Sequence, residues 1–254
     1  SMRGRSHSTD SLRSPDLRSL TTKYGTWAIV TGASSGIGRS FAHQLARAGM
    51  NVVLVSRSED TLEKIANDLR SQFAVQTQVF ALDLSQPIAR ETLDLETLDL
   101  DVGLLVNNAA VEQRGAFVRH TTDELGEAIE LNVTAPTELG QRFGRRFVQQ
   151  GRGGIVFVSG SIGYQAVPHM ASYAAAKALF ERYVLAHNQE SGLPFTMIRP
   201  YNWFGPKMDF IPGRDGEGVP RVLACCMAAL LDGQPMQLVD GGAAYRTLAD
   251  RDGA

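Results

Sequence analysis

A tyrosine and a lysine four residues apart, Tyr173 and Lys177, close the stretch GGIVFVSGSIGYQAVPHMASYAAAK at residues 153–177. This spacing places both side chains on one face of a helix, one turn apart. An ammonium beside a phenol stabilises the phenolate and lowers its pKa, so the tyrosine can exchange a proton with an alcohol or a carbonyl oxygen. Taken alone, such a pair is more often a packed tyrosine and a surface lysine. A second motif is needed before the pair indicates catalysis.

That second motif is the segment TGASSGIG, Thr31 to Gly38, which follows a predicted strand and opens a predicted helix. Its glycines let the backbone turn tightly and approach a pyrophosphate, whose charge then lies at a helix N-terminus. The alternative is a tight turn that binds nothing. The predicted cofactor loop comprises Gly32, Ser34, Ser35, Gly36, Ile37 and Gly38.

Two further residues concern the adenosine end of a dinucleotide. Arg57 stands where an enzyme that uses NAD usually carries an acidic residue, and a guanidinium suits the 2′-phosphate of NADP. The alternative is an ordinary solvated arginine at a strand end. Asp83 closes another predicted strand and either accepts a hydrogen bond from adenine or caps the next helix. The sequence therefore favours NADP(H) over NAD(H) as the cofactor.

The elements that must position these residues alternate along the chain. Short apolar runs begin at residues 27, 51, 77, 103, 154, 195 and 236, with helical stripes such as Leu139, Phe143 and Phe147 between them. Such alternation predicts an α/β fold, a doubly wound, Rossmann-type parallel sheet of about seven strands with helices on both faces, in a single domain. Residues 1–23 are expected to be a disordered extension, and residues 24–254 the Rossmann domain, with a substrate loop around 201–220.

The composition limits the kinds of partner that the chain is expected to bind. A net charge of -2 gives no field that would hold a nucleic acid or an anionic membrane, so a small-molecule partner is favoured. The only cysteines, Cys225 and Cys226, are adjacent, so they cannot form a metal site alone and are poorly placed to bridge each other. We therefore predict no metal and a reducing, cytoplasmic compartment. No apolar run approaches the roughly 20 residues that cross a bilayer, so no membrane span is expected.

Together with NNAA at 107–110 and LNV at 131–133, the motifs TGASSGIG and YAAAK resemble the short-chain dehydrogenase/reductase family over about residues 25–200. The resemblance implies that Tyr173 is the general acid and that Lys177 holds the nicotinamide ribose and lowers the pKa of the tyrosine. It implies that Asn132 supports a proton-relay water. It also places in the cofactor site Asp83, Leu84, Asn107, Ala109 and Pro200, and it implies homodimers or homotetramers. Residues 24–65 look most like the NADP-dependent hydroxysteroid and ketoacyl reductases.

The chain departs from the family at one catalytic position. The family normally carries a substrate-orienting serine thirteen residues before the tyrosine, and that position is Gly160 here. Ser159 and Ser161 flank it, but neighbouring residues of a strand point to opposite faces. Ser161 could replace the missing hydroxyl only if the chain turns sharply after the strand, as Gly160 would permit. Ser159 is the weaker candidate because it should still lie in the strand.

The C-terminal quarter, from LPFTMIRPYNWFGP onward, resembles a different branch of the same superfamily, the extended epimerases and decarboxylases of sugar nucleotides. If the roles of the matching residues hold for this chain, the resemblance implies that Asn202 contacts a sugar nucleotide and that Arg246 contacts its phosphates. Alternative interpretations are a turn residue for Asn202 and a tail charge for Arg246. The two resemblances together suggest a hybrid or recombined chain.

Three hypotheses follow. The first is an NADP(H)-dependent oxidoreductase that interconverts a ketone and a secondary alcohol, with Tyr173 as general acid/base. The second is an enzyme that modifies a nucleoside diphosphate sugar and keeps NAD(P) bound. The third, motivated by Gly160, is a catalytically impaired protein that binds NADP without turnover.

Overall fold

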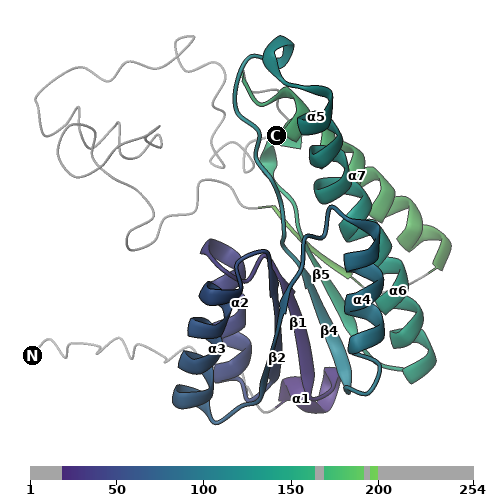
Figure 1. Cartoon of the computed structure of the whole chain (residues 1–254). Coiled ribbons are helices and arrows are strands. Elements are labelled where there is room, and N and C mark those ends of the chain that lie inside the picture. The colour runs from purple at the N-terminus through teal and green to yellow at the C-terminus, as the bar shows by residue number, and fades with distance from the viewer. Residues whose placement is uncertain (1–18, 164–168, 192–194, 200–254) are drawn as a thin grey trace, which may run out of the picture. The chain divides into compact units, whose positions relative to one another are not determined.

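The structure is a computed structural model, and it describes residues 19–163, 169–191 and 195–199. In this part of the chain, six parallel strands form one sheet in the order β3-β2-β1-β4-β5-β6 (Figure 1). They are β1 (Trp27–Thr31), β2 (Asn51–Ser56), β3 (Thr77–Ala81), β4 (Val102–Asn107), β5 (Gly154–Val158) and β6 (Phe195–Ile198). The doubly wound parallel sheet predicted from the sequence is confirmed. The seventh predicted strand, from residue 236, lies outside the described residues.

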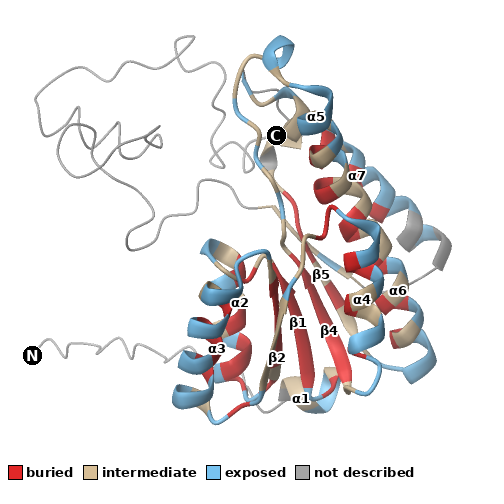
Figure 2. Cartoon of the chain, in the orientation of Figure 1, coloured by how far each residue is buried: buried red, intermediate tan, exposed pale blue. Residues whose placement is uncertain are grey.

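Helices cover both faces of the sheet (Figure 1). One face carries α2 (Gly36–Arg47) and α3 (Glu59–Phe73), and the other carries α4 (Pro87–Glu96), α6 (Ala135–Gln150) and α7 (Ala171–Ser191). Alternate residues of each strand point to opposite faces, so Ile29 of β1 joins one core and Val30 joins the other. The sheet and the inner helix faces are accordingly buried in Figure 2.

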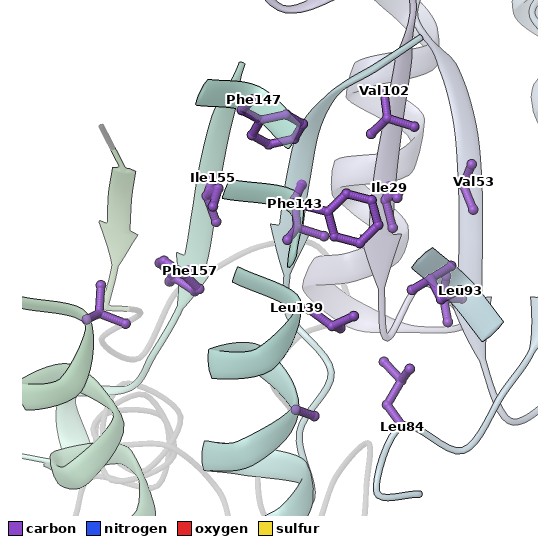
Figure 3. Close-up of a cluster of buried hydrophobic side chains, with 14 of the residues drawn as sticks. Ile29, Val53, Leu84, Leu93, Val102, Leu139, Phe143, Phe147, Ile155 and Phe157 are labelled. Carbon is purple, nitrogen blue, oxygen red and sulfur yellow. The ribbon is translucent and has the colours of Figure 1, made fainter. Parts of the chain in front are cut away.

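One of the two cores lies under α4, α6 and α7. Figure 3 shows the predicted stripe of α6, Leu139, Phe143 and Phe147, in the same cluster as Ile29 and Ile155 of the sheet. All five side chains are almost fully buried. Because this packing fixes where α6 and α7 lie on the sheet, it also fixes the position of α7, which carries Tyr173 and Lys177, relative to β5.

The N-terminal boundary differs from the one expected. Helix α1 (Ser19–Tyr24) begins inside the segment that the sequence analysis assigned to a disordered extension. The reason is local packing, since Leu20 and Tyr24 lie against the core under α2 and α3, and the Tyr24 main chain lies directly against Gly103 of β4. Residues 1–18 lie outside the described residues.

Three short elements complete the path from β4 to α6, the first of which is the 3₁₀ helix η1 (Phe117–Arg119). Helix α5 (Thr122–Ile129) starts with a capping box, in which the Thr121 hydroxyl accepts from the Glu124 amide and the Glu124 carboxylate accepts from the Thr121 amide. A single π-helical turn, η2 (Glu130–Thr134), joins α5 directly to α6. Such turns are frequent at functional sites, and this one carries Asn132.

Candidate active site

The candidate residues gather at the carboxyl edge of the sheet. The chain turns back across the sheet between β3 and β4, so β1 and β4, which are neighbours, lead to helices on opposite faces. In open α/β sheets the crevice at this switch point is where ligands bind. The glycine turn follows β1 here, Asn107 ends β4, and Ser159 and Gly160 follow β5.

The glycine turn has the geometry that a phosphate needs. Gly32 and Gly36 have φ angles of 65° and 51°, the left-handed region that glycine adopts readily. A Cβ at Gly38 would lie 2.2 Å from the Gly32 carbonyl oxygen, whereas a Cβ at Gly36 would have no atom within 4 Å. Ser35 caps α2 without a side-chain hydrogen bond, so its hydroxyl does not occupy the first amides of the helix. This open, positively polarised helix end fits a pyrophosphate.

The other predicted loop residues divide into two groups. Ser34 is half-buried and Ser35 is exposed, so both lie at the surface of the turn. Ile37 packs against the core under α2, which gives it a structural role.

The end of β4 is tied to the glycine turn by hydrogen bonds. The Thr31 hydroxyl accepts from the Asn108 amide at 2.9 Å and the Ala109 amide at 3.0 Å. The Asn108 side chain donates to the carbonyl oxygens of Thr31 and Gly32. Asn107 instead donates to the Pro136 carbonyl of α6 at 3.3 Å. The sequence analysis named Asn107 and Ala109 but missed Asn108, although the Asn-Asn pair is visible in NNAA.

The adenosine side combines expected and unexpected contacts. Asp83 accepts from the amide and the hydroxyl of Ser85 at 3.1 and 2.8 Å through one carboxylate oxygen, so it caps its own turn, and its predicted contact with adenine stays a prediction. Leu84 is buried in the main core. Arg57 is exposed and forms an ion pair with Glu127 of α5 at 3.2 Å, a partner that the sequence did not indicate.

Tyr173 and Lys177 lie on one face of α7, as predicted. The Lys177 ammonium lies 5.5 Å from the centre of the Tyr173 ring and donates to the Val158 carbonyl of β5 at 3.3 Å. Burial lowers the pKa of Lys177 to about 8, while the nearby Glu181 carboxylate opposes the shift. The lysine is thus almost completely enclosed, with only 3% of its surface exposed.

The pKa of Tyr173 differs in direction from the expectation. Burial, and secondarily the Glu112 carboxylate, raise the pKa of this phenol to about 12. The lysine was expected to lower it, but removal of the phenol from water outweighs an ammonium at this distance. Tyr173 is therefore a protonated phenol at neutral pH, the form that can donate a proton.

Asn132 is fully buried in η2 and is held at both ends of its amide. It donates to the Val111 carbonyl at 2.9 Å and accepts from the Val111 amide at 3.1 Å. These bonds anchor the loop after β4 beside the catalytic helix. The implied role of Asn132 in supporting a water stays a prediction.

Gly160 leaves room for a side chain beside the phenol. A Cβ at this position would lie 3.8 Å from the Tyr173 hydroxyl and 3.6 Å from Ile162. Gly160 carries no positive φ, so a serine would need no unusual backbone. A side chain at this position would therefore lie beside the Tyr173 hydroxyl.

The flanking serines differ in their setting. The Ser159 amide donates to the Ile198 carbonyl at 2.8 Å, and its buried hydroxyl has no hydrogen-bond partner among the described residues. The chain does turn sharply here, because Ser161 opens the 3₁₀ helix η3 (Ser161–Gly163), though its side chain is not described. Pro200, Asn202 and Arg246 lie outside the described residues.

With this fold and site in place, comparison with known proteins identifies the class. A family model described as short chain dehydrogenase matches residues 26–193. The chain belongs to this family, as its motifs suggested.

Individual relatives agree with the family. The chain is 36% identical over 160 residues to a 7beta-hydroxysteroid dehydrogenase from Collinsella aerofaciens, covering 63% of this chain and 60% of that protein. It is 33% identical over 179 residues to the human inactive hydroxysteroid dehydrogenase-like protein 1, covering 67% of this chain and 53% of that protein. The chain thus spans little more than half the length of these relatives.

A different relative matches a shorter stretch more strongly. The chain is 62% identical over 78 residues to UDP-D-apiose/UDP-D-xylose synthase 2 from Arabidopsis thaliana, covering 30% of this chain but only 20% of that protein.

Solved structures share the architecture. One reported for 7beta-hydroxysteroid dehydrogenase stereoselectivity has a TM-score of 0.67 at 32% identity, covering 71% of this chain and 73% of the other. A short-chain dehydrogenase from Sphingobium yanoikuyae in complex with NADPH has a TM-score of 0.64 at 32% identity, covering 68% and 70%. Within the described residues, no helix is both long and apolar enough to span a membrane.

Proposed function

We propose that this protein is an NADP(H)-dependent oxidoreductase that interconverts a ketone and a secondary alcohol. The observation that carries the proposal is the pairing of a protonated Tyr173 with an enclosed Lys177, beside a glycine turn whose open helix end fits a pyrophosphate. The solved relatives with bound NADPH or NADP support this cofactor. The likeness to a hydroxysteroid dehydrogenase supports an apolar, lipid-like ketone as substrate.

Different residues of the chain then bind different parts of the cofactor. The turn from Gly32 to Gly38 holds the pyrophosphate, and Arg57 leaves Glu127 to meet the 2′-phosphate. Lys177 holds the ribose next to the nicotinamide. The bound cofactor supplies or accepts the hydride at the substrate carbon.

Tyr173 moves the proton. In the reducing direction its phenol, which is protonated at neutral pH, donates a proton to the carbonyl oxygen. The adjacent ammonium stabilises the phenolate that remains. Ser161, or Ser159 with its unpartnered hydroxyl, would orient the carbonyl in place of a side chain at Gly160.

The direct test is Tyr173→Phe, which removes the proton donor but keeps the ring in its packing. We expect NADPH binding to persist and ketone-dependent NADPH oxidation to fall by at least about 10²-fold. Equal turnover in the two proteins would rule out this role for Tyr173.

A second candidate is a nucleoside diphosphate sugar enzyme that keeps NAD(P) bound. The strong local match to UDP-D-apiose/UDP-D-xylose synthase favours it. In this case a UDP-sugar should protect the protein against heat, and Arg246→Ala should remove that protection. The third candidate, a protein impaired in turnover, is favoured by Gly160 and by the likeness to an inactive relative. We further propose a cytoplasmic location and a homodimer or homotetramer.

A further inference from the structure

An ion pair with a buried carboxylate lies one turn beyond Lys177 on α7. Glu181 follows Lys177 by four residues on α7, and its carboxylate is almost fully buried. The Arg199 Nε lies 3.0 Å from both carboxylate oxygens, at the end of β6. A carboxylate is seldom buried without a compensating charge, and here the guanidinium provides it.

The position of this carboxylate matters because Lys177 is itself enclosed. Burial disfavours the ammonium, and within the part of the chain that the structure describes, the lysine donates to the Val158 carbonyl. Residues four apart on a helix share a face, so Glu181 presents its negative charge to the same side of α7 as Lys177. It is the charge that opposes the effect of burial on the lysine.

The other charged residues around α7 are exposed, are paired elsewhere or act on a different group than Lys177. Of the elements packed against α7, η3 has no ionisable residue, and η2 has Glu130, which pairs with Arg90 of α4. The charges of α5 and α6 are either exposed, as at Asp123 and Arg145, or paired with residues outside α7 (Glu124 with His120, Glu127 with Arg57, Glu138 with Arg90 and Arg142, Arg146 with Asp94). Glu112 acts on the Tyr173 phenol from the loop after β4. The ionisable groups set against Lys177 are therefore Tyr173 and Glu181.

We propose that Glu181 is a positioning residue, a carboxylate that Arg199 holds behind Lys177 so that the buried lysine stays an ammonium at working pH. The proposal deepens, and for its catalytic meaning rests on, the oxidoreductase function proposed above. Arg199 then has a double effect, since it holds the Glu181 carboxylate in place and ties the end of β6 to α7.

The test follows the titration of Lys177 without needing any ligand. The free energy of unfolding is measured in urea from pH 6 to 10.5 for the native protein and for Lys177→Met, and the difference between them isolates the lysine. The same difference is measured in proteins that carry Glu181→Gln. In the proteins with Glu181→Gln, we expect the pH at which Lys177 loses its proton to be lower by about one unit or more than in the native background. This is the size of effect that a charge within about 4–6 Å exerts.

Two further variants separate a charge effect from simple loss of packing. Glu181→Asp keeps the charge and should leave the titration close to the native pH. Arg199→Gln breaks the same ion pair but keeps the negative charge, so the titration should stay or move up. The proposal is overturned if Glu181→Gln leaves the titration unchanged, or if Arg199→Gln lowers it as much as Glu181→Gln does.

Activity gives an independent second readout. The alkaline limb of kcat/KM for NADPH-dependent ketone reduction should move in the same direction as the Lys177 titration. If the native chain shows no turnover, the oxidoreductase proposal fails, while the unfolding titration still decides the role of Glu181.

Discussion

Replacing Lys177 with methionine should make the protein more stable at neutral pH while it removes activity. The side chain keeps its length and loses a charge that is costly to bury. The pKa of the lysine is about 8 in the folded protein against 10.5 for an ordinary lysine. At about 1.4 kcal/mol per pH unit, this difference corresponds to about 3 kcal/mol of destabilisation. The variant also loses the hydrogen bond to Val158, and this loss destabilises it by about 1 kcal/mol. The net expected gain at pH 7 is about 2 kcal/mol.

The expected stability difference between Lys177→Met and the native protein depends on pH in one direction. Below pH 8 both folded and unfolded chains carry the proton, so the full cost of burying the charge is present. Between pH 8 and 10.5 the unfolded chain binds more protons than the folded one, so native stability rises with pH. The advantage of Lys177→Met should therefore shrink over this window and vanish above it.

The assay is urea unfolding of the native protein, of Lys177→Met and of Lys64→Met, in which an exposed lysine of α3 is removed as a control. The control should change stability by less than about 0.5 kcal/mol at every pH. If Lys177→Met is less stable than the native protein at pH 7, by an amount that does not change up to pH 10.5, the burial argument is refuted.

Three other predictions concern single positions. Gly160→Ser puts a hydroxyl donor next to the Tyr173 phenol, but because Ser161 or Ser159 is proposed to orient the carbonyl already, kcat for ketone reduction, measured as NADPH oxidation, should change by less than about tenfold. A gain of about 10²-fold would mean that neither flanking serine takes that role. Gly38→Ala would place a Cβ against the Gly32 carbonyl, so it should weaken NADPH binding, measured by fluorescence titration, by at least about tenfold. The control Gly126→Ala on α5, where an added Cβ has no atom within 4 Å, should leave NADPH binding unchanged. Arg90→Met leaves the carbonyls of the turn after β3 without their buried donor, while Glu138 keeps its ion pair with Arg142, so the free energy of unfolding should fall by about 1–3 kcal/mol. An unchanged free energy of unfolding would contradict this.

The fold and the catalytic pair could be predicted because they depend on local patterns. Alternating strands and helices specify the sheet order up to a few topologies, and a spacing of four residues fixes the relative position of Tyr173 and Lys177 on any helix. The glycine turn is likewise encoded locally, since Gly32, Gly36 and Gly38 each meet a backbone or steric requirement within the turn.

What could not be predicted depends on contacts between distant segments. The pairs Arg57 with Glu127 and Glu181 with Arg199 join elements 70 and 18 residues apart, and no spacing in the sequence signals them. The pKa of Tyr173 follows from how deeply the fold buries the phenol, which the sequence motif does not contain. The helix at Ser19–Tyr24 was missed because its stability comes from packing against the core under α2 and α3.

The most direct test of the proposed chemistry is ketone-dependent oxidation of NADPH, measured over steroid, ketoacyl and small ketones for the native chain, Tyr173→Phe and Gly160→Ser together. The account predicts turnover of at least one ketone by the native chain and its loss in Tyr173→Phe. A native chain that binds NADPH but oxidises it with no ketone, or oxidises it equally well without the Tyr173 hydroxyl, would contradict the account.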